Sequence, residues 1–180
     1  MPFGRTKGVW LGKIIIAYCS ASEKNKHSNE EKVALELEKL FAGKGFHVKK
    51  MLLAPKKKMG LKEQFKDEKK LQLKEGITSF AGTDFVILGS PTVGSLTSSP
   101  LANTLIRSLP KISKGAKKPF FALYSTGIIQ GFAIKKMQSL LSMKGITPVE
   151  SASFTSIFEF DAKKLLEVKT FFERMLAAAD

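Results

Sequence analysis

The chain has 180 residues, of which 43% are hydrophobic and 26% are charged. That length suits one domain with a sizeable core, and that composition excludes a disordered chain. No apolar run is long enough to span a bilayer, and no secretory leader pattern follows Arg5 and Lys7. The single cysteine, Cys19, excludes an internal disulfide framework and favours a reducing compartment. We therefore expect a cytoplasmic protein without a membrane span.

The charge is strongly unbalanced, with 30 Lys and Arg against 16 Asp and Glu, a net charge of +14. Such an excess favours contact with anions, and lysine suits general electrostatics better than base reading. The lysines also recur every fourth residue in one segment. They are Lys58, Lys62, Lys66, Lys70 and Lys74. We expect a helix from about Leu61 to carry this row as a basic stripe, which is either a solvated face or a docking surface.

Five short apolar segments follow one another, each with a helical pattern or a helical candidate behind it. Residues 1–12 have no clear period and are expected to form an N-terminal arm over the sheet edge, ahead of a single domain at 13–180. The predicted strands are 13–18, 46–53, 84–88, 119–124 and 146–154. The predicted helices are 29–42, one from about 61, 101–109, one around 133–141, and one from about 161. Strict alternation of this kind predicts a parallel α/β sheet with helices on both faces.

The most informative stretch runs from Asp84 to Leu105. Residues 84–88 are almost wholly apolar, which is typical of a strand covered on both faces. Pro91 has no N–H for a sheet ladder, so we expect the strand to end at Gly89-Ser90-Pro91. A polar loop at 92–97 follows. Ser98, Ser99 and Pro100 then supply a cap candidate and a first-turn proline for the next helix.

The same stretch resembles a known family. The run at 89–94, followed by Ser-Pro-Leu at 99–101, is similar to the third strand–loop unit of flavodoxin-like proteins, and a weaker resemblance extends from about Lys13 to the C-terminus. It implies a flavodoxin-like three-layer sandwich, with a five-stranded parallel sheet in the order 2-1-3-4-5. Ligands of such sheets bind where the strand order reverses, which lies between strands one and three. The resemblance also implies an FMN cofactor.

The loop after the first strand is the expected phosphate site, because hydroxyls and amides at a helix N-terminus suit an anion. The expected residues are Ser20, Ala21, Ser22, Lys26, His27, Ser28 and Asn29. Two residues depart from the family pattern, since Ser28 replaces a glycine and Glu30 replaces a threonine. A carboxylate at that position should repel a phosphate unless it points away. Ser28 and Glu31 also have the spacing of a capping box, which needs no ligand.

Two further loops are expected to contact the flavin ring. Their residues are Pro91, Thr92, Val93, Gly94 and Ser95 in one loop, and Ser125, Thr126, Gly127 and Gly131 in the other. Glycines let the backbone approach a planar ligand closely. The family usually covers the ring with aromatic side chains, but residues 92–99 contain none and only Phe132 lies near the second loop. The alternative is a set of plain loops on a scaffold that has lost its cofactor.

Several other chemistries have no support in the sequence. Two histidines and one cysteine do not make a metal site, and no phosphate-binding P-loop, dinucleotide fingerprint or nucleophile elbow is present. We name no catalytic residue. The leading hypothesis is an FMN-binding electron-transfer protein or flavin-dependent oxidoreductase with an acidic redox partner protein. The alternative is a flavin-free binding module whose basic surface docks an acidic protein or, less favoured, nucleic acid.

Overall fold

The fold is that of a computed structural model, which describes residues 5–6, 9–10, 12–20, 28–93, 96–112, 115, 117–156 and 160–179, with backbone alone at 5–6 and 9–10. The sheet strands are β3 (Lys13–Tyr18), β4 (His47–Leu52), β5 (Thr83–Val93), β6 (Thr97–Ser98), β7 (Phe120–Gly127) and β8 (Glu150–Thr155). The helices are α1 (Asn29–Gly43), α2 (Leu61–Lys66), α3 (Pro100–Ser108), α4 (Ala133–Ser142) and α5 (Ala162–Ala177), with a 3₁₀ turn η1 at Glu68–Lys70. A short antiparallel pair, β1 (Arg5–Thr6) and β2 (Val9–Trp10), precedes them.

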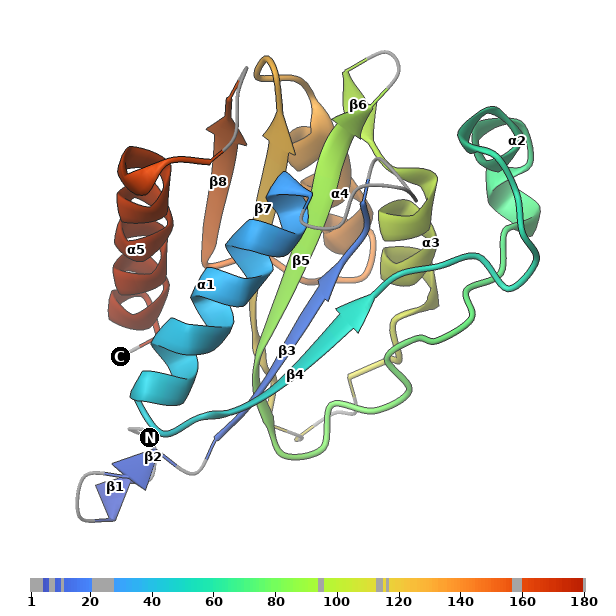
Figure 1. The fold of residues 1–180 in the computed structure, drawn as a ribbon. Helices are drawn as coiled ribbons and strands as arrows, with labels where there is room; N and C mark the ends of the chain where they lie inside the picture. Colours follow the sequence, from blue (N-terminus) through green and yellow to red (C-terminus); the bar gives the residue numbers. More distant parts are fainter. Residues whose placement is uncertain are drawn as a thin grey trace.

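Five strands pair in parallel in the order β4-β3-β5-β7-β8 (Figure 1). Numbered in chain order among themselves, these strands give 2-1-3-4-5, so the predicted order is confirmed. The order in which strands are added to the sheet reverses at β3, because β4 lies on one side of it and β5 on the other. β6 adds a short antiparallel pairing to the end of β5.

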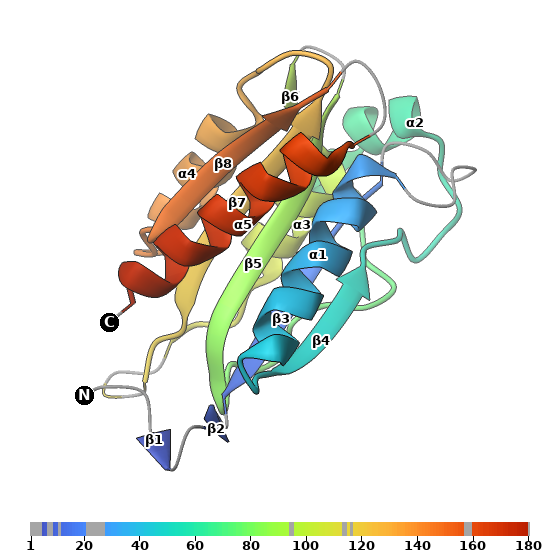
Figure 2. The same ribbon diagram turned by 60° about the vertical axis from the view of Figure 1, so that its left-hand side comes forward.

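Helices cover both faces of the sheet (Figures 1 and 2). On one face α1 and α5 pack through Val33, Leu37, Phe41, Val168 and Phe172, all buried. On the other face α3 and α4 pack through residues that include Leu105, Ile106, Met137 and Leu141. The central strands are apolar towards both layers, as the continuous run at 84–88 predicts. No helix in the described part of the chain is long and apolar enough to cross a membrane.

The predicted end of the third strand at Pro91 is wrong, because β5 continues to Val93. The Gly89 carbonyl accepts a hydrogen bond at 3.3 Å from the N–H of Cys19, the residue that follows β3. Successive residues of a strand form their backbone hydrogen bonds towards opposite neighbours. Pro91 is two residues after Gly89, so its nitrogen also faces the β3 side of β5. The pairing with β3 ends at Gly89, whereas the pairing with β7 continues to Pro91. A proline is tolerated there because its missing N–H has no partner to lose.

Two other predictions also differ from the structure. β7 runs to Gly127 and takes in Ser125 and Thr126, which were expected in a loop, because β5 and β8 supply backbone partners on both sides. The helix expected to carry the lysine row ends at Lys66. The chain then makes η1 and returns extended, where the Lys74 N–H donates to the Ala54 carbonyl at 2.9 Å. The five lysines therefore do not form one helical stripe.

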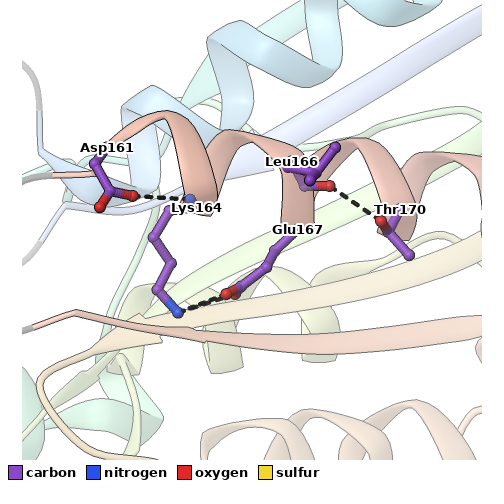
Figure 3. A network of polar contacts seen from close by, with 5 residues as sticks. All are labelled: Asp161, Lys164, Leu166, Glu167 and Thr170. Carbon is purple, nitrogen blue, oxygen red and sulfur yellow. Dashed lines mark hydrogen bonds and ion pairs between the residues drawn. The ribbon is translucent and has the colours of Figure 1, made fainter.

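Side-chain caps begin three helices where the sequence indicates them. Ser28 accepts from the Glu31 N–H at the start of α1, and Ser99 accepts from the Leu101 N–H at the start of α3, both at 3.3 Å. The Asp161 carboxylate accepts from the Lys164 N–H at the start of α5, at 3.0 Å (Figure 3). Such caps satisfy N–H groups that have no partner inside the helix.

Candidate functional site

The carboxyl ends of β3 and β5 meet at the point where the strand order reverses. β3 ends at Tyr18 opposite Gly89, and Cys19 follows directly. The Cys19 thiol is fully buried, and burial raises its pKa to about 12. A protonated, enclosed thiol is a poor nucleophile, so this residue belongs to the core rather than to the chemistry of the site.

A cavity of about 530 Å³ opens at this rim. Its volume lies in the range of small-molecule and cofactor pockets. It is lined by Tyr18, Ser20, Ser28, Glu31, Leu52, Leu53, Ala54, Pro55, Lys58, Met59, Gly60, Leu61, Gln64, Pro91, Val93, Ser99 and Leu101. These residues come from the ends of β3, β4 and β5 and from the segments that follow them.

The inner wall contains residues that the sequence assigns to two of the expected loops. Ser20 and Ser28 flank the first loop, and Pro91 and Val93 end β5. The Ser28 hydroxyl already caps α1, which confirms one half of the proposed capping box. Four segments of different sequence position thus share one cavity, and the wall combines hydroxyls with apolar carbons.

The outer wall was not predicted to take part in the site. It comes from residues 52–64, where apolar residues lie on both sides of a lysine run at 56–58. Leu53 is buried, and Met59 packs against the same core cluster. The pattern Leu-Leu-Ala-Pro at 52–55 was the available signal, but the surrounding lysines indicated a solvated face. This segment is held beside the sheet because the chain returns and pairs with it: the Lys56 N–H donates to the Gln72 carbonyl, and the Lys74 N–H donates to the Ala54 carbonyl.

Gln64 closes the outer wall and keeps one free acceptor. It is the buried residue of α2, and its side-chain amide donates to the Met59 carbonyl at 3.0 Å. Its Oε1 is buried and has no hydrogen-bond partner among the described residues. Buried polar atoms nearly always have a hydrogen-bond partner. An N–H or O–H group of a ligand could supply the partner that this oxygen lacks.

Tyr18 sits at the inner wall with its ring largely buried. Burial raises the pKa of its hydroxyl to about 12, and the nearby carboxylates of Glu31 and Glu38 add to the increase. A tyrosine is protonated at physiological pH even at its ordinary pKa, so Tyr18 brings an O–H donor to the cavity lining.

The third expected loop does not line the cavity. Ser125 and Thr126 lie within β7 and are buried. The Ser125 hydroxyl shares a hydrogen bond of 2.9 Å with the Ser153 hydroxyl. The Thr126 hydroxyl donates to the carboxylate of Glu30. Both hydroxyls are thus already engaged within the sheet rim.

Glu30, the unexpected carboxylate of the phosphate loop, points towards β7. It is 4% exposed and does not line the cavity. Besides the bond from Thr126 to its side chain, its backbone carbonyl accepts from the Tyr124 hydroxyl at 2.9 Å. Burial raises the pKa of that tyrosine, and Glu30 is the next largest cause. The orientation keeps the carboxylate out of the cavity's lining.

The two loops expected to hold a flavin ring contact each other directly. The Phe132 N–H donates to the Leu96 carbonyl at 2.5 Å. A Cβ on Gly131 would meet that same carbonyl and would lie 2.6 Å from Thr92 Cγ2. Leu96 itself has a φ of 61°, a backbone conformation that side chains disfavour. Gly131 is therefore required for close packing between the loops.

The remaining predicted site residues fall in three groups. Asn29 is the first residue of α1, and Gly127 ends β7. Thr92 is partly exposed at the end of β5. Ala21, Ser22, Lys26, His27, Gly94 and Ser95 lie outside the described residues. Within the described ranges no group of His, Cys, Asp and Glu has the arrangement of a metal site.

The fold is shared with several solved structures. Oxidised flavodoxin 1 from Bacillus cereus matches with a TM-score of 0.63 and 12% identity over 92% of this chain and 98% of that one. Two-electron reduced Megasphaera elsdenii flavodoxin matches with a TM-score of 0.56 and 17% identity, covering 92% and 99%. Rubredoxin oxygen:oxidoreductase from Desulfovibrio gigas matches with a TM-score of 0.57 and 18% identity, covering 93% of this chain and 36% of that one.

These likenesses establish the fold alone, because the three sequence identities are only 12–18%. The chain has a flavodoxin-like fold, and its structural neighbours are flavodoxins and flavoproteins. No protein-family model matches the sequence, and no curated protein matches it.

Proposed function

We propose that this protein binds FMN at the rim of β3 and β5 and transfers electrons, either to a partner protein or to a small acceptor. The observation that carries the proposal is the cavity at the strand-order reversal, where ligands of open α/β sheets bind. FMN would supply the redox chemistry when bound. The chain's own part would be to bind and orient the cofactor and to limit water around it.

The expected phosphate residues are Ser20, Ala21, Ser22, Lys26, His27, Ser28 and Asn29. Three observations support this part of the proposal. Ser20 and Ser28 line the cavity, and Asn29 begins a helix of 15 residues, whose N-terminus favours an anion. Glu30 is turned to Thr126 rather than into the cavity. These observations support a phosphate at this end, beside the carboxylate of Glu31, which also lines the cavity.

The ring would lie towards Pro91, Thr92, Val93, Gly94 and Ser95, with Ser125, Thr126, Gly127 and Gly131 behind it. Pro91 and Val93 line the cavity and offer it apolar surface. A small molecule that accepts electrons would occupy the outer half of the cavity, near the unpaired side-chain oxygen of Gln64. That division favours a reductase over a simple carrier, because a carrier needs no second compartment beside its cofactor.

The test is the visible absorption spectrum of the freshly purified protein, followed by titration of micromolar FMN with flavin fluorescence as the readout. We expect a yellow protein or saturable quenching of added FMN. A colourless protein that leaves FMN fluorescence unchanged would overturn the proposal.

Two variants locate the cofactor within the cavity. Val93→Trp fills the inner half, where the proposal places FMN, and should abolish quenching. Leu61→Asp alters the outer wall, where Leu61 is 39% exposed, and should leave FMN affinity unchanged. Far-UV circular dichroism verifies that both variants fold. Equal loss of FMN binding in both would contradict the assignment of the inner half.

A second candidate function is a flavin-free binding module. Its supporting observation is a groove lined by basic side chains beside η1, α3 and α4. The groove residues are Phe65, Lys66, Asp67, Glu68, Lys69, Lys70, Arg107 and Lys136. The direct contact between the two ring loops is also consistent with a scaffold that has no ring to hold.

This candidate predicts binding to an acidic protein or nucleic acid that weakens as salt increases. Replacing Lys62, Lys66 and Lys70 by Glu should abolish that binding. A protein that binds FMN and shows no affinity for such polyanions at low salt would remove the candidate.

A further inference from the structure

Three large apolar side chains are exposed on one short loop between β7 and α4. Ile128, Ile129 and Phe132 are 68%, 55% and 59% exposed. The described part of the chain has seven exposed large hydrophobic residues, so this loop holds three of them within five positions. We call residues 128–132 the apolar rim loop. Exposed apolar side chains in a cluster mark an interaction surface, whereas single ones do not.

The backbone of this loop is held in place at both ends. Gly127, just before it, accepts through its carbonyl from the Ser156 N–H at 2.9 Å, and Phe132 donates to Leu96. Gly131 packs against Thr92 and Leu96 without room for a side chain. The loop lies at the same end of the sheet as β6 in both views (Figures 1 and 2). The apolar side chains therefore project from a supported rim.

Basic residues flank the loop. The Lys135 ammonium lies 5.6 Å from the centre of the Phe132 ring. Lys136 is exposed on the first turn of α4 and lines the groove that also contains Lys66, Lys69 and Lys70. Asp67 and Glu68 line the same groove, and Glu68 forms an ion pair with Arg107 at 2.6 Å, so the lysines supply its excess positive charge. The apolar rim loop and the lysine-lined groove are therefore joined through the start of α4. The net charge of the chain is +14.

We propose that the apolar rim loop and the adjoining basic face dock onto an anionic membrane surface. Projecting Ile and Phe side chains would enter the headgroup–acyl boundary, and the lysines would contact anionic lipid headgroups. The aliphatic pair Ile128 and Ile129 argues against nucleic acid, which offers stacking and phosphate contacts but no aliphatic pocket. The proposal does not depend on whether flavin binds.

The first test is cosedimentation of the full chain with vesicles of phosphatidylcholine alone and with vesicles that also contain phosphatidylserine. We expect binding to the anionic vesicles only, weakened by added salt. The triple variant Ile128→Ser, Ile129→Ser, Phe132→Ser should lose about tenfold in affinity. Its matched control is Met143→Ser with Leu166→Ser, which removes exposed apolar side chains elsewhere and should bind as the wild type does.

The charge contribution is tested in the same assay. Lys135→Glu with Lys136→Glu should lower the affinity by about 30-fold or more, because a lysine near an anionic surface is worth about fivefold. The control is Lys163→Glu with Lys169→Glu, an equal charge change at exposed positions of α5. Equal losses for the two pairs would show that net charge alone drives binding and would overturn the assigned surface.

A local readout completes the design. Ile129→Trp places a fluorophore on the loop, and its emission should shift to shorter wavelength with anionic vesicles after subtraction of the Trp10 background. No shift together with no cosedimentation at low salt would overturn the proposal. So would binding to an acidic protein that depends on the loop while vesicles show none.

Discussion

The Thr126 hydroxyl on β7 donates a hydrogen bond to the side-chain carboxylate of Glu30 on α1, across the carboxyl rim of the sheet. The Tyr124 hydroxyl, two residues earlier on β7, binds the backbone carbonyl of the same glutamate. α1 is therefore tied to a strand that is two places away from β3 in the sheet. This link decides where the unusual carboxylate of the predicted phosphate loop lies.

The first prediction concerns the charge of Glu30. Glu30→Gln keeps an acceptor for Thr126 but removes a negative charge close to the proposed phosphate site. We expect FMN affinity to increase by about fivefold to tenfold, since repulsion between two like charges at a partly screened site is worth on the order of 1 kcal/mol. Fluorescence titration measures it. Glu173→Gln, at an exposed position of α5, is the control and should change nothing.

The second prediction concerns the contact between the two rim loops. Gly131→Ala should destabilise the protein by about 1–3 kcal/mol, because the new Cβ collides with Leu96 and Thr92. Gly43→Ala is the control, since a Cβ at the end of α1 meets nothing within 4 Å. It should stabilise slightly, as alanine favours a helix over glycine. Urea unfolding measures both, and equal effects would contradict the packing argument.

The third prediction concerns alkaline pH. Burial raises the pKa of Cys19 from an ordinary 9.0 to about 12, so the unfolded chain loses this proton first as the pH rises. The contribution to stability is full below about pH 9 and is lost between about 9 and 12. Cys19→Ala should therefore lose less stability over that interval than the wild type does, as urea unfolding at a series of pH values would show.

The buried thiol gives an independent measurement. Native protein at pH 8 should react with a thiol reagent only on the timescale of unfolding, since Cys19 has no exposed surface. Rapid modification under native conditions would contradict its burial.

The fourth prediction compares two interactions at the start of α5 (Figure 3). Asp161→Ala removes the helix cap and should cost about 1 kcal/mol in the free energy of unfolding. Lys164→Ala removes the ion pair with Glu167, at 2.9 Å on the surface, and should cost much less. A larger loss for the lysine variant would be the contrary result.

Local sequence patterns determined most of the secondary structure. The run at 13–18 and the helical face of Val33, Leu37 and Phe41 appear as predicted, because a strand or helix must bury its apolar side chains. Ser28, Ser99 and Asp161 begin their helices because a cap acts within three residues. Such features depend only on near neighbours in the chain.

Strand ends were predicted less well. β5 passes Pro91 because the sheet has no strand left to pair on that side, and β7 passes Tyr124 because β5 and β8 continue beside it. The helix expected over the lysine row stops at Lys66, and the chain returns to pair with residues after β4. Each outcome depends on partners distant in sequence.

The sequence by itself determined the alternation of strands and helices, and therefore a parallel sheet whose order reverses beside β3. Tertiary structure alone decided the shape of the cavity, which takes its outer wall from residues 52–64, and the direction of Glu30, which a hydroxyl 96 positions away fixes. The physical reason is the distance along the chain over which each kind of interaction acts. Periodicity and caps act over a few residues, whereas walls and buried hydrogen bonds need groups that only the folded chain brings together.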